Sequence, residues 1–105
     1  MAKISNEIID KILKLVNEAK KDHINISKAI LFGSYAKGTN NEWSDIDLAV
    51  ISDDFEGIRY FDNIKLSNSR LNSDINIETH PFKPDDFTID NAFVSEILKY
   101  GIQIV

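Results

Sequence analysis

The stretch LFGSYAKGTNNEWSDIDLAV, residues 31–50, joins a Gly-Ser pair to two aspartates that begin an apolar run. In DIDLAVI, residues 45–51, apolar side chains alternate with Asp45 and Asp47, as on a strand with one buried face. Side chains two residues apart on a strand point the same way, about 7 Å apart along it, so the two carboxylates converge. Bare carboxylates would repel each other there, whereas Mg²⁺ binds such oxygens together with substrate phosphates. The stretch therefore predicts a strand that begins at metal-binding acids.

The Gly-Ser pair directly follows a second apolar run. KAILF, residues 28–32, is too short for a helix and is stopped by Gly33, which indicates a buried strand. Glycine lets the backbone approach a ligand closely, and the amides of a helical turn after Ser34 would favour an anion. Antiparallel pairing of residues 28–32 with residues 45–51 puts this phosphate seat and the two acids at one end of the sheet.

The sequence after the acids predicts a strand-helix-strand unit. Residues 54–71 carry Ile58, Phe61 and Ile64 at helical spacing and lead to SDINIET, residues 73–79. Parallel strands need a dozen or more connecting residues, and this connection has that length. We therefore expect the third strand to run parallel to the strand that carries the acids.

One-sided helices are expected at both ends of the chain. Residues 5–22 have apolar side chains at helical spacing behind an N-cap serine, and residues 91–100 have them before Gly101. The final IQIV fits a short edge strand. His80, next to Pro81, is expected in a surface loop, with contact to a nucleotide as the alternative. The predicted fold class is therefore α/β (α+β), with a small mixed β-sheet flanked by helices.

A third carboxylate is expected near the first two, either to hold a second metal ion or to deprotonate a hydroxyl. Asp74 and Glu78 share one face of the strand at residues 73–79. If that strand is parallel to the one carrying Asp45 and Asp47, its first residue lies beside the acids, and Glu78 lies about 13 Å further along. Asp74 is therefore the predicted third acid, with Glu78 as the alternative.

Length and composition limit the function. At 105 residues the chain is expected to be a single domain, 1–105. Its formal charge of −5 disfavours an extended nucleic-acid surface, and the absence of cysteine excludes thiolate metal sites. No purely apolar run exceeds four residues and the opening residues lack a signal-peptide core. We expect a cytoplasmic protein with no membrane segment.

The residues quoted above form a composite motif. Gly33-Ser34, ten residues and Asp45-x-Asp47 match the GS-x10-DxD signature, and the chain resembles the DNA-polymerase-β-like nucleotidyltransferases. The longer string GSYAKGTNNEWSDIDLAV is similar to their minimal nucleotidyltransferase (MNT) branch, and the resemblance extends over nearly the whole chain. It implies the polymerase-β-like fold, Mg²⁺ (or Mn²⁺) on the two aspartates, and ATP or another nucleoside triphosphate as substrate.

The resemblance also implies roles for individual residues. The acids predicted to be catalytic and to bind metal are Asp45, Asp47 and Asp74. The residues predicted to bind the nucleotide are Gly33, Ser34, Lys37 and Ser44. Lys37 stands where family members often have arginine. It keeps the positive charge but cannot form the two parallel hydrogen bonds that a guanidinium donates to a phosphate.

The implied reaction is transfer of AMP, or another nucleoside monophosphate, from the triphosphate to an acceptor hydroxyl. A chain this short has no room for an acceptor domain, and the resemblance implies that the acceptor belongs to a HEPN-domain partner, with this protein as the antitoxin of a toxin–antitoxin pair. The alternative is a non-catalytic module that binds nucleotide or neutralises the partner by contact. The acceptor, the preferred nucleotide and assembly as a homo- or hetero-oligomer are left open.

Overall fold

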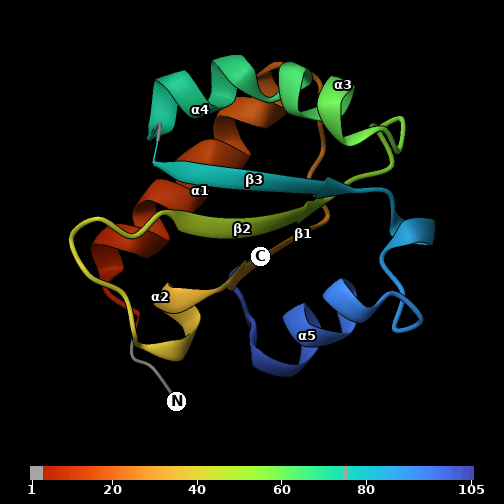
Figure 1. The fold of residues 1–105 in the computed structure, drawn as a ribbon. Helices are drawn as coiled ribbons and strands as arrows, with labels where there is room; N and C mark the ends of the chain where they lie inside the picture. Colours follow the sequence, from red (N-terminus) through yellow and green to blue (C-terminus); the bar gives the residue numbers. More distant parts are fainter. Residues whose placement is uncertain (1–3, 75) are drawn as a thin grey trace.

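The computed structural model describes residues 4–74 and 76–105 (Figure 1). Along the chain the elements are α1 (Asn6–Lys21), β1 (Lys28–Phe32), α2 (Ser34–Lys37), β2 (Ile46–Ile51), α3 (Arg59–Lys65), α4 (Ser67–Ser73), β3 (Ile77–Phe82), the 3₁₀ helix η1 (Pro84–Asp86), α5 (Ala92–Tyr100) and β4 (Ile102–Gln103). None of the helices within the described residues is long and apolar enough to cross a membrane.

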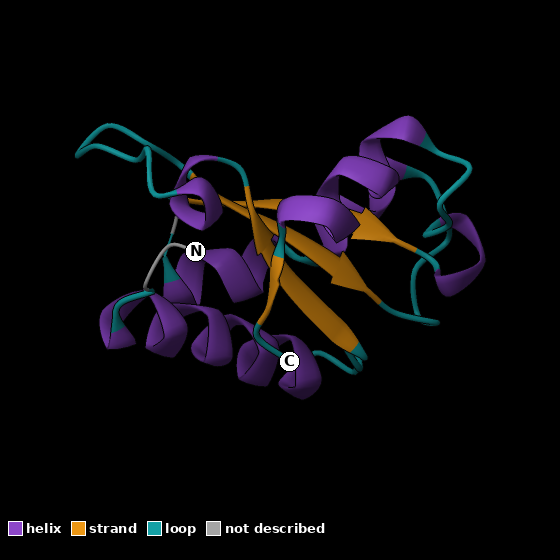
Figure 2. Cartoon of the chain, turned by 90° about the horizontal axis from the view of Figure 1, so that it is seen from below, coloured by secondary structure: helices purple, strands orange, loops and turns teal. Residues whose placement is uncertain are grey.

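The four strands form one mixed sheet in the order β3-β2-β1-β4. β1 is antiparallel to both β2 and β4, and β2 is parallel to β3. Helices lie on both sides of this sheet (Figure 2). The predicted fold class, the antiparallel pair and the parallel third strand are therefore confirmed.

The sheet separates two apolar cores. Along β2, Ile46, Leu48 and Val50 face the larger core, which α1 shares, while Ala49 and Ile51 face a smaller one with Ile97 of α5. Alternation along the strand therefore places Asp47 on the same face as Ala49, the α5 side. This face is the one on which the predicted phosphate seat and acids meet.

The connection between β2 and β3 forms two helices and buries a face that apolar spacing did not predict. Ile58, Phe61 and Ile64 are exposed, whereas Asp62 is fully buried. The Asp62 carboxylate accepts hydrogen bonds from the backbone N–H groups of Glu56, at 2.8 Å, and Gly57, at 2.9 Å. A buried carboxylate is stable when it has such partners, so the polar side of α3 faces inward.

β3 begins later and ends later than predicted. It spans Ile77–Phe82 and not residues 73–79, of which residue 75 lies outside the described residues. Pro81 is tolerated because β3 is an edge strand that pairs only with β2. His80 therefore lies within the strand with 8% of its surface exposed, and its expected place in a surface loop was wrong.

Candidate active site

Gly33 lies directly against the second aspartate of the motif. Its φ is +73°, in the left-handed region, and a Cβ added there would collide with the Asp47 carboxylate. The pairing of Phe32 with Asp47 across β1 and β2 creates this contact. Only glycine fits between the turn and the acid, so the predicted phosphate seat and the acidic strand do meet at one end of the sheet.

Asp47 forms a compact group with two side chains of β3. Register pairs Asp47 with Glu78, and His80 follows two residues later on the same strand face. One ligand atom from each of Asp47, Glu78 and His80 lies within 4.8 Å of the others. Asp47 is half-buried, Glu78 is exposed and His80 is buried. The group therefore opens toward solvent on its Glu78 side.

Hydrogen bonding fixes how His80 faces this group. The Arg59 Nη2 atom lies 2.9 Å from His80 Nδ1, and His80 Nε2 lies 3.4 Å from Asp47 Oδ1. A guanidinium only donates, so Nδ1 must accept and a neutral ring carries its proton on Nε2. Burial and the positive charge of Arg59 lower the pKa of His80 below its ordinary 6.5, against the opposing effect of Asp47. Nε2–H therefore donates toward Asp47, and that nitrogen has no lone pair for a metal ion.

The acids fit a hard divalent cation once His80 is assigned as a donor. Asp47 and Glu78 contribute carboxylate oxygens at the centre of the group. Asp45 is not part of this group of three, but it lines an adjoining cavity of about 420 Å³ together with Glu78 and Arg59. Mg²⁺ prefers oxygen ligands and commonly takes one or two carboxylates with substrate phosphates. The residues present are therefore suited to Mg²⁺ or Mn²⁺.

Asp74 has different partners. Its Oδ2 atom lies 2.9 Å from Lys11 Nζ, and its Oδ1 atom accepts the Asn76 N–H at 2.8 Å. The hydrogen bond with the Lys11 ammonium is the main reason that the pKa of Asp74 lies below its usual value. Because β3 starts at Ile77, Asp74 precedes the strand, and Glu78 is the acid that lies opposite Asp47. The expected place of Asp74 beside the two aspartates depended on a strand start four residues too early.

Two predicted nucleotide-binding residues have contacts of their own. Lys37 Nζ lies 3.6 Å from a carboxylate oxygen of Glu96 and 5.2 Å from the centre of the Tyr100 ring. The Ser44 Oγ atom accepts the Asn41 N–H at 3.0 Å, which ties the loop before β2. The structure thus places Lys37 near Gly33, where both line a small cavity of about 160 Å³, and gives Ser44 a turn-stabilising contact.

Sequence reasoning missed Arg59 and the placement of His80. Alternation from Glu78 puts His80 on the same strand face, and this signal was available in the sequence. Arg59 begins a helix after an irregular loop, and no local pattern shows which side chain it reaches.

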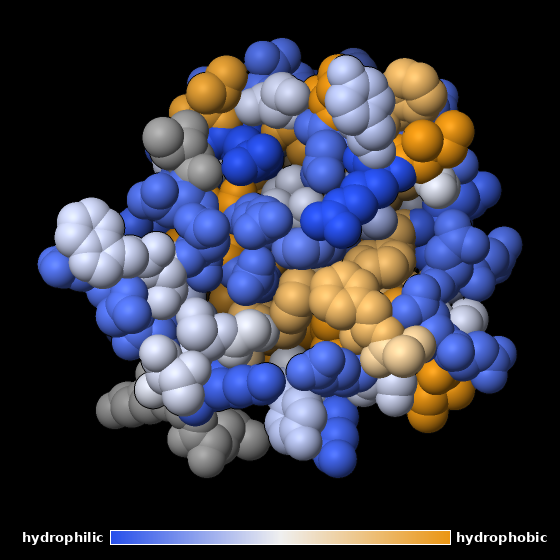
Figure 3. Space-filling view, in the orientation of Figure 1, coloured by the Kyte–Doolittle hydropathy of each residue, from blue (hydrophilic) through white to orange (hydrophobic). Residues whose placement is uncertain are grey.

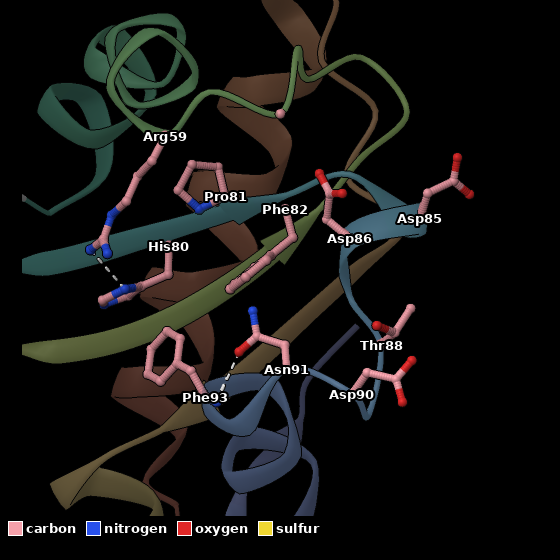
Figure 4. A pocket seen from close by; sticks show the side chains of 11 residues that line it. Arg59, His80, Pro81, Phe82, Asp85, Asp86, Thr88, Asp90, Asn91 and Phe93 are labelled. Atoms are coloured by element: carbon pink, nitrogen blue, oxygen red, sulfur yellow. Dashed lines mark hydrogen bonds between the residues drawn. The ribbon is translucent and has the colours of Figure 1, made fainter.

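A larger cavity adjoins the site. Its volume is about 640 Å³, and Arg59 and His80 lie together on one side of it (Figure 4). The site thus consists of a glycine turn, three acids, a histidine held by an arginine, and a cavity beside them. This combination of fold and residues is the one expected of a nucleotidyltransferase.

Comparison with known proteins agrees with that class. Residues 9–103 match the nucleotidyltransferase domain family, so the chain belongs to it, and the prediction of a nucleotidyltransferase enzyme is confirmed. The chain is 33% identical over 100 residues to "Putative protein adenylyltransferase MJ0141" of Methanocaldococcus jannaschii, covering 89% of this chain and 98% of that protein.

Two solved structures share the fold. One is a toxin–antitoxin with AMP-PNP, with a TM-score of 0.64 and 25% identity over 96% of this chain and 73% of that one. The other is a mutant of the toxin–antitoxin MntA-HpeT, with a TM-score of 0.61 and 22% identity over 92% of this chain and 72% of that one. The predicted resemblance to nucleotidyltransferases is confirmed.

Proposed function

We propose that the protein transfers AMP from ATP to a hydroxyl group of a partner protein. The observation that carries this proposal is the convergence of Asp47 and Glu78 beside Gly33 in a chain of the nucleotidyltransferase family. Asp45, Asp47 and Glu78 would hold Mg²⁺, with Glu78 in the role predicted for Asp74. Gly33 and Ser34 would hold the phosphates of the nucleotide.

The relatives support the choice of nucleotide and acceptor. The Methanocaldococcus jannaschii relative is named for protein adenylylation, and the chain covers 98% of it. One solved relative is a toxin–antitoxin with AMP-PNP, an analogue of ATP. These names favour ATP as donor, a protein as acceptor and a toxin as partner. The HEPN class of that partner is proposed from the sequence resemblance, and a cytoplasmic location from the composition of the chain.

Each side chain of the site would have a separate role in the proposed AMP transfer. The acceptor oxygen attacks the α-phosphorus, the bond to the bridging oxygen breaks, and pyrophosphate leaves. The exposed Glu78 carboxylate is placed to take the hydroxyl proton. Asp47 is held in one orientation by contact with Gly33 and by the His80 N–H. Bound Mg²⁺ would supply charge neutralisation at the α-phosphate and the leaving pyrophosphate.

The direct test uses the intact protein and its genomic neighbour. The chain is incubated with α-labelled ATP, Mg²⁺ and the product of the neighbouring reading frame, and that product is analysed by mass spectrometry. We expect label and the mass of one or more AMP groups on a hydroxyl side chain, with release of pyrophosphate. ATP binding with neither pyrophosphate release nor labelled protein would show a nucleotide-binding module instead of a transferase.

Replacing His80 should weaken the site through Asp47. Leucine removes both ring nitrogens, whereas glutamine keeps an N–H donor for Asp47 and an acceptor for Arg59. Partners that orient a metal ligand are typically worth about 10- to 100-fold in metal affinity or activity. We expect His80→Leu to lose that much in Mn²⁺ affinity and in kcat/KM, and His80→Gln to recover most of it. Titration of Mn²⁺ binding and steady-state kinetics measure both; equal losses in the two variants would show that ring packing alone matters.

A further inference from the structure

A cavity beside the acids is formed where β3 ends and α5 begins. It has a volume of about 640 Å³ and is bounded by the end of β3, by η1 and by the loop that enters α5 (Figure 4). Arg59 and His80 belong both to this cavity and to the group around Asp47. A molecule bound in the cavity would therefore lie next to the reacting centre.

The inner side of the cavity is aromatic. The Phe93 ring centre lies 5.8 Å from that of His80 and 6.3 Å from that of Phe82, and the three rings line one wall. Phe93 keeps 39% of its surface exposed although it lies at the start of a helix that packs on the sheet. On this face an apolar area lies beside hydrophilic side chains (Figure 3). Such a wall can contact an apolar or aromatic side chain.

The outer side is acidic. Asp85, Asp86 and Asp90 line it and are exposed, and Figure 4 shows them together on one side of the cavity. Within residues 4–74 and 76–105 none of these three carboxylates forms an ion pair. Among the residues that line the cavity only Arg59 carries a positive charge, and it faces His80. The outer side of the cavity therefore repels a triphosphate and attracts a cation.

The cavity is also distinct from the space beside the glycine turn. Phe93 lines both this cavity and the small one that Gly33 and Lys37 line, so its ring stands between them. The proposed function places the phosphates of the nucleotide at Gly33, on the side of Phe93 where the small cavity lies. The second substrate is the molecule that needs a place in the larger cavity.

We infer that this cavity is the acceptor subsite, and that it takes a segment of a partner protein in which lysine or arginine flanks an apolar or aromatic side chain. The cationic side chains pair with Asp85, Asp86 and Asp90, while the apolar or aromatic side chain lies against Phe82 and Phe93. This inference rests on the proposed function, because it names the class of acceptor that the active site would select.

Binding can be measured without catalysis. The probe is a fluorescein-labelled, amidated peptide in which two lysines lie on each side of a tyrosine, compared with the same peptide carrying glutamates. Fluorescence polarisation with the full chain and no nucleotide gives both dissociation constants. We expect the lysine peptide to bind at least about tenfold more tightly, because each of several charge pairs adds a modest favourable term.

The matched variants separate the cavity from overall charge. Asp85→Asn/Asp86→Asn/Asp90→Asn should weaken lysine-peptide binding about tenfold and leave the affinity for ATP unchanged. Asp10→Asn/Glu42→Gln/Asp53→Asn changes the net charge equally at exposed sites elsewhere and should retain binding. Phe93→Ala should weaken it without any change in charge, and circular dichroism checks that every variant is folded.

Each outcome decides one question. Equal losses in the two triple variants, or equal binding of the lysine and glutamate peptides, would overturn the acceptor subsite. A wild-type chain that binds the lysine peptide at the cavity yet transfers no AMP to any acceptor would leave the subsite standing and defeat the proposed function. Transfer to the partner that is unchanged in the Asp85, Asp86 and Asp90 variant would keep the function and reject the subsite.

Discussion

Asparagine at Asp47 is expected to abolish AMP transfer and leave the fold intact. Asp47 is the acid that contacts Gly33, receives the His80 N–H and lies opposite Glu78. Loss of a metal-binding carboxylate removes several kcal/mol of charge stabilisation in the transition state. We therefore expect the rate to fall by about 10³-fold or more.

The same variant should be at least as stable as the wild type. Asparagine has the size of aspartate, and its Oδ1 atom can still accept from His80. It also removes one of the negative charges that repel each other when no metal ion is bound. A higher melting temperature would show that the wild-type site trades stability for function, and an unchanged one would show only that the fold is intact.

Three measurements test this variant. Transfer of α-label to the partner measures catalysis, Mn²⁺ titration measures the site, and thermal melting measures the fold. Asp53→Asn is the matched control, since Asp53 is an exposed acid in the turn after β2. Full transfer by Asp47→Asn would remove the basis of the proposed function. If Asp45→Asn/Asp47→Asn transfers nothing but still binds and silences the partner, contact alone neutralises it.

The parts of the fold that the sequence predicts well are those set by strong local patterns. β1 and β2 could be located because one apolar run ends just before Gly33 and another follows directly from Asp45. Both faces of the sheet are buried, which makes these runs apolar. Antiparallel pairing then brings Gly33 to Asp47. The centre of the candidate site thus follows from one hairpin.

The details that were missed depend on helix ends and hydrogen bonds that the spacing of apolar residues does not encode. α4 ends at Ser73 and Asp74 caps it, so β3 begins only at Ile77 and Glu78 lies opposite Asp47, the place expected for Asp74. Similarly, Asp62 is buried because backbone groups of Glu56 and Gly57 bind its carboxylate. Neither local propensity nor apolar spacing contains this information, because hydrogen bonds from the backbone to a side chain decide it.

The third acid can be identified by comparing Glu78→Gln with Asp74→Asn. Glu78 is exposed and has no role in the core, so glutamine there should leave stability unchanged. If Glu78 binds metal and takes the acceptor proton, its loss should reduce kcat about 10²- to 10⁴-fold, the usual contribution of general acid–base catalysis. Mn²⁺ affinity should fall as well, which a purely structural role would not cause.

Asp74→Asn should show the opposite pattern. The ion pair with the partly exposed Lys11 is worth about 0.2–1 kcal/mol, and asparagine can still accept the Asn76 N–H, so the free energy of unfolding should fall by no more than about 1 kcal/mol. Because Lys11 lowers the folded-state pKa of Asp74, its contribution is present above the ordinary value of 3.8 and is lost as the pH falls through the folded-state pKa. Urea unfolding should therefore separate wild type and variant at pH 7, and the difference should shrink as the pH falls below 3.8. AMP transfer should stay within about threefold of wild type, a change below 1 kcal/mol in activation free energy.

Loss of transfer in Asp74→Asn with full activity in Glu78→Gln would instead assign the third acid to Asp74, and would require the start of β3 to rearrange when nucleotide binds.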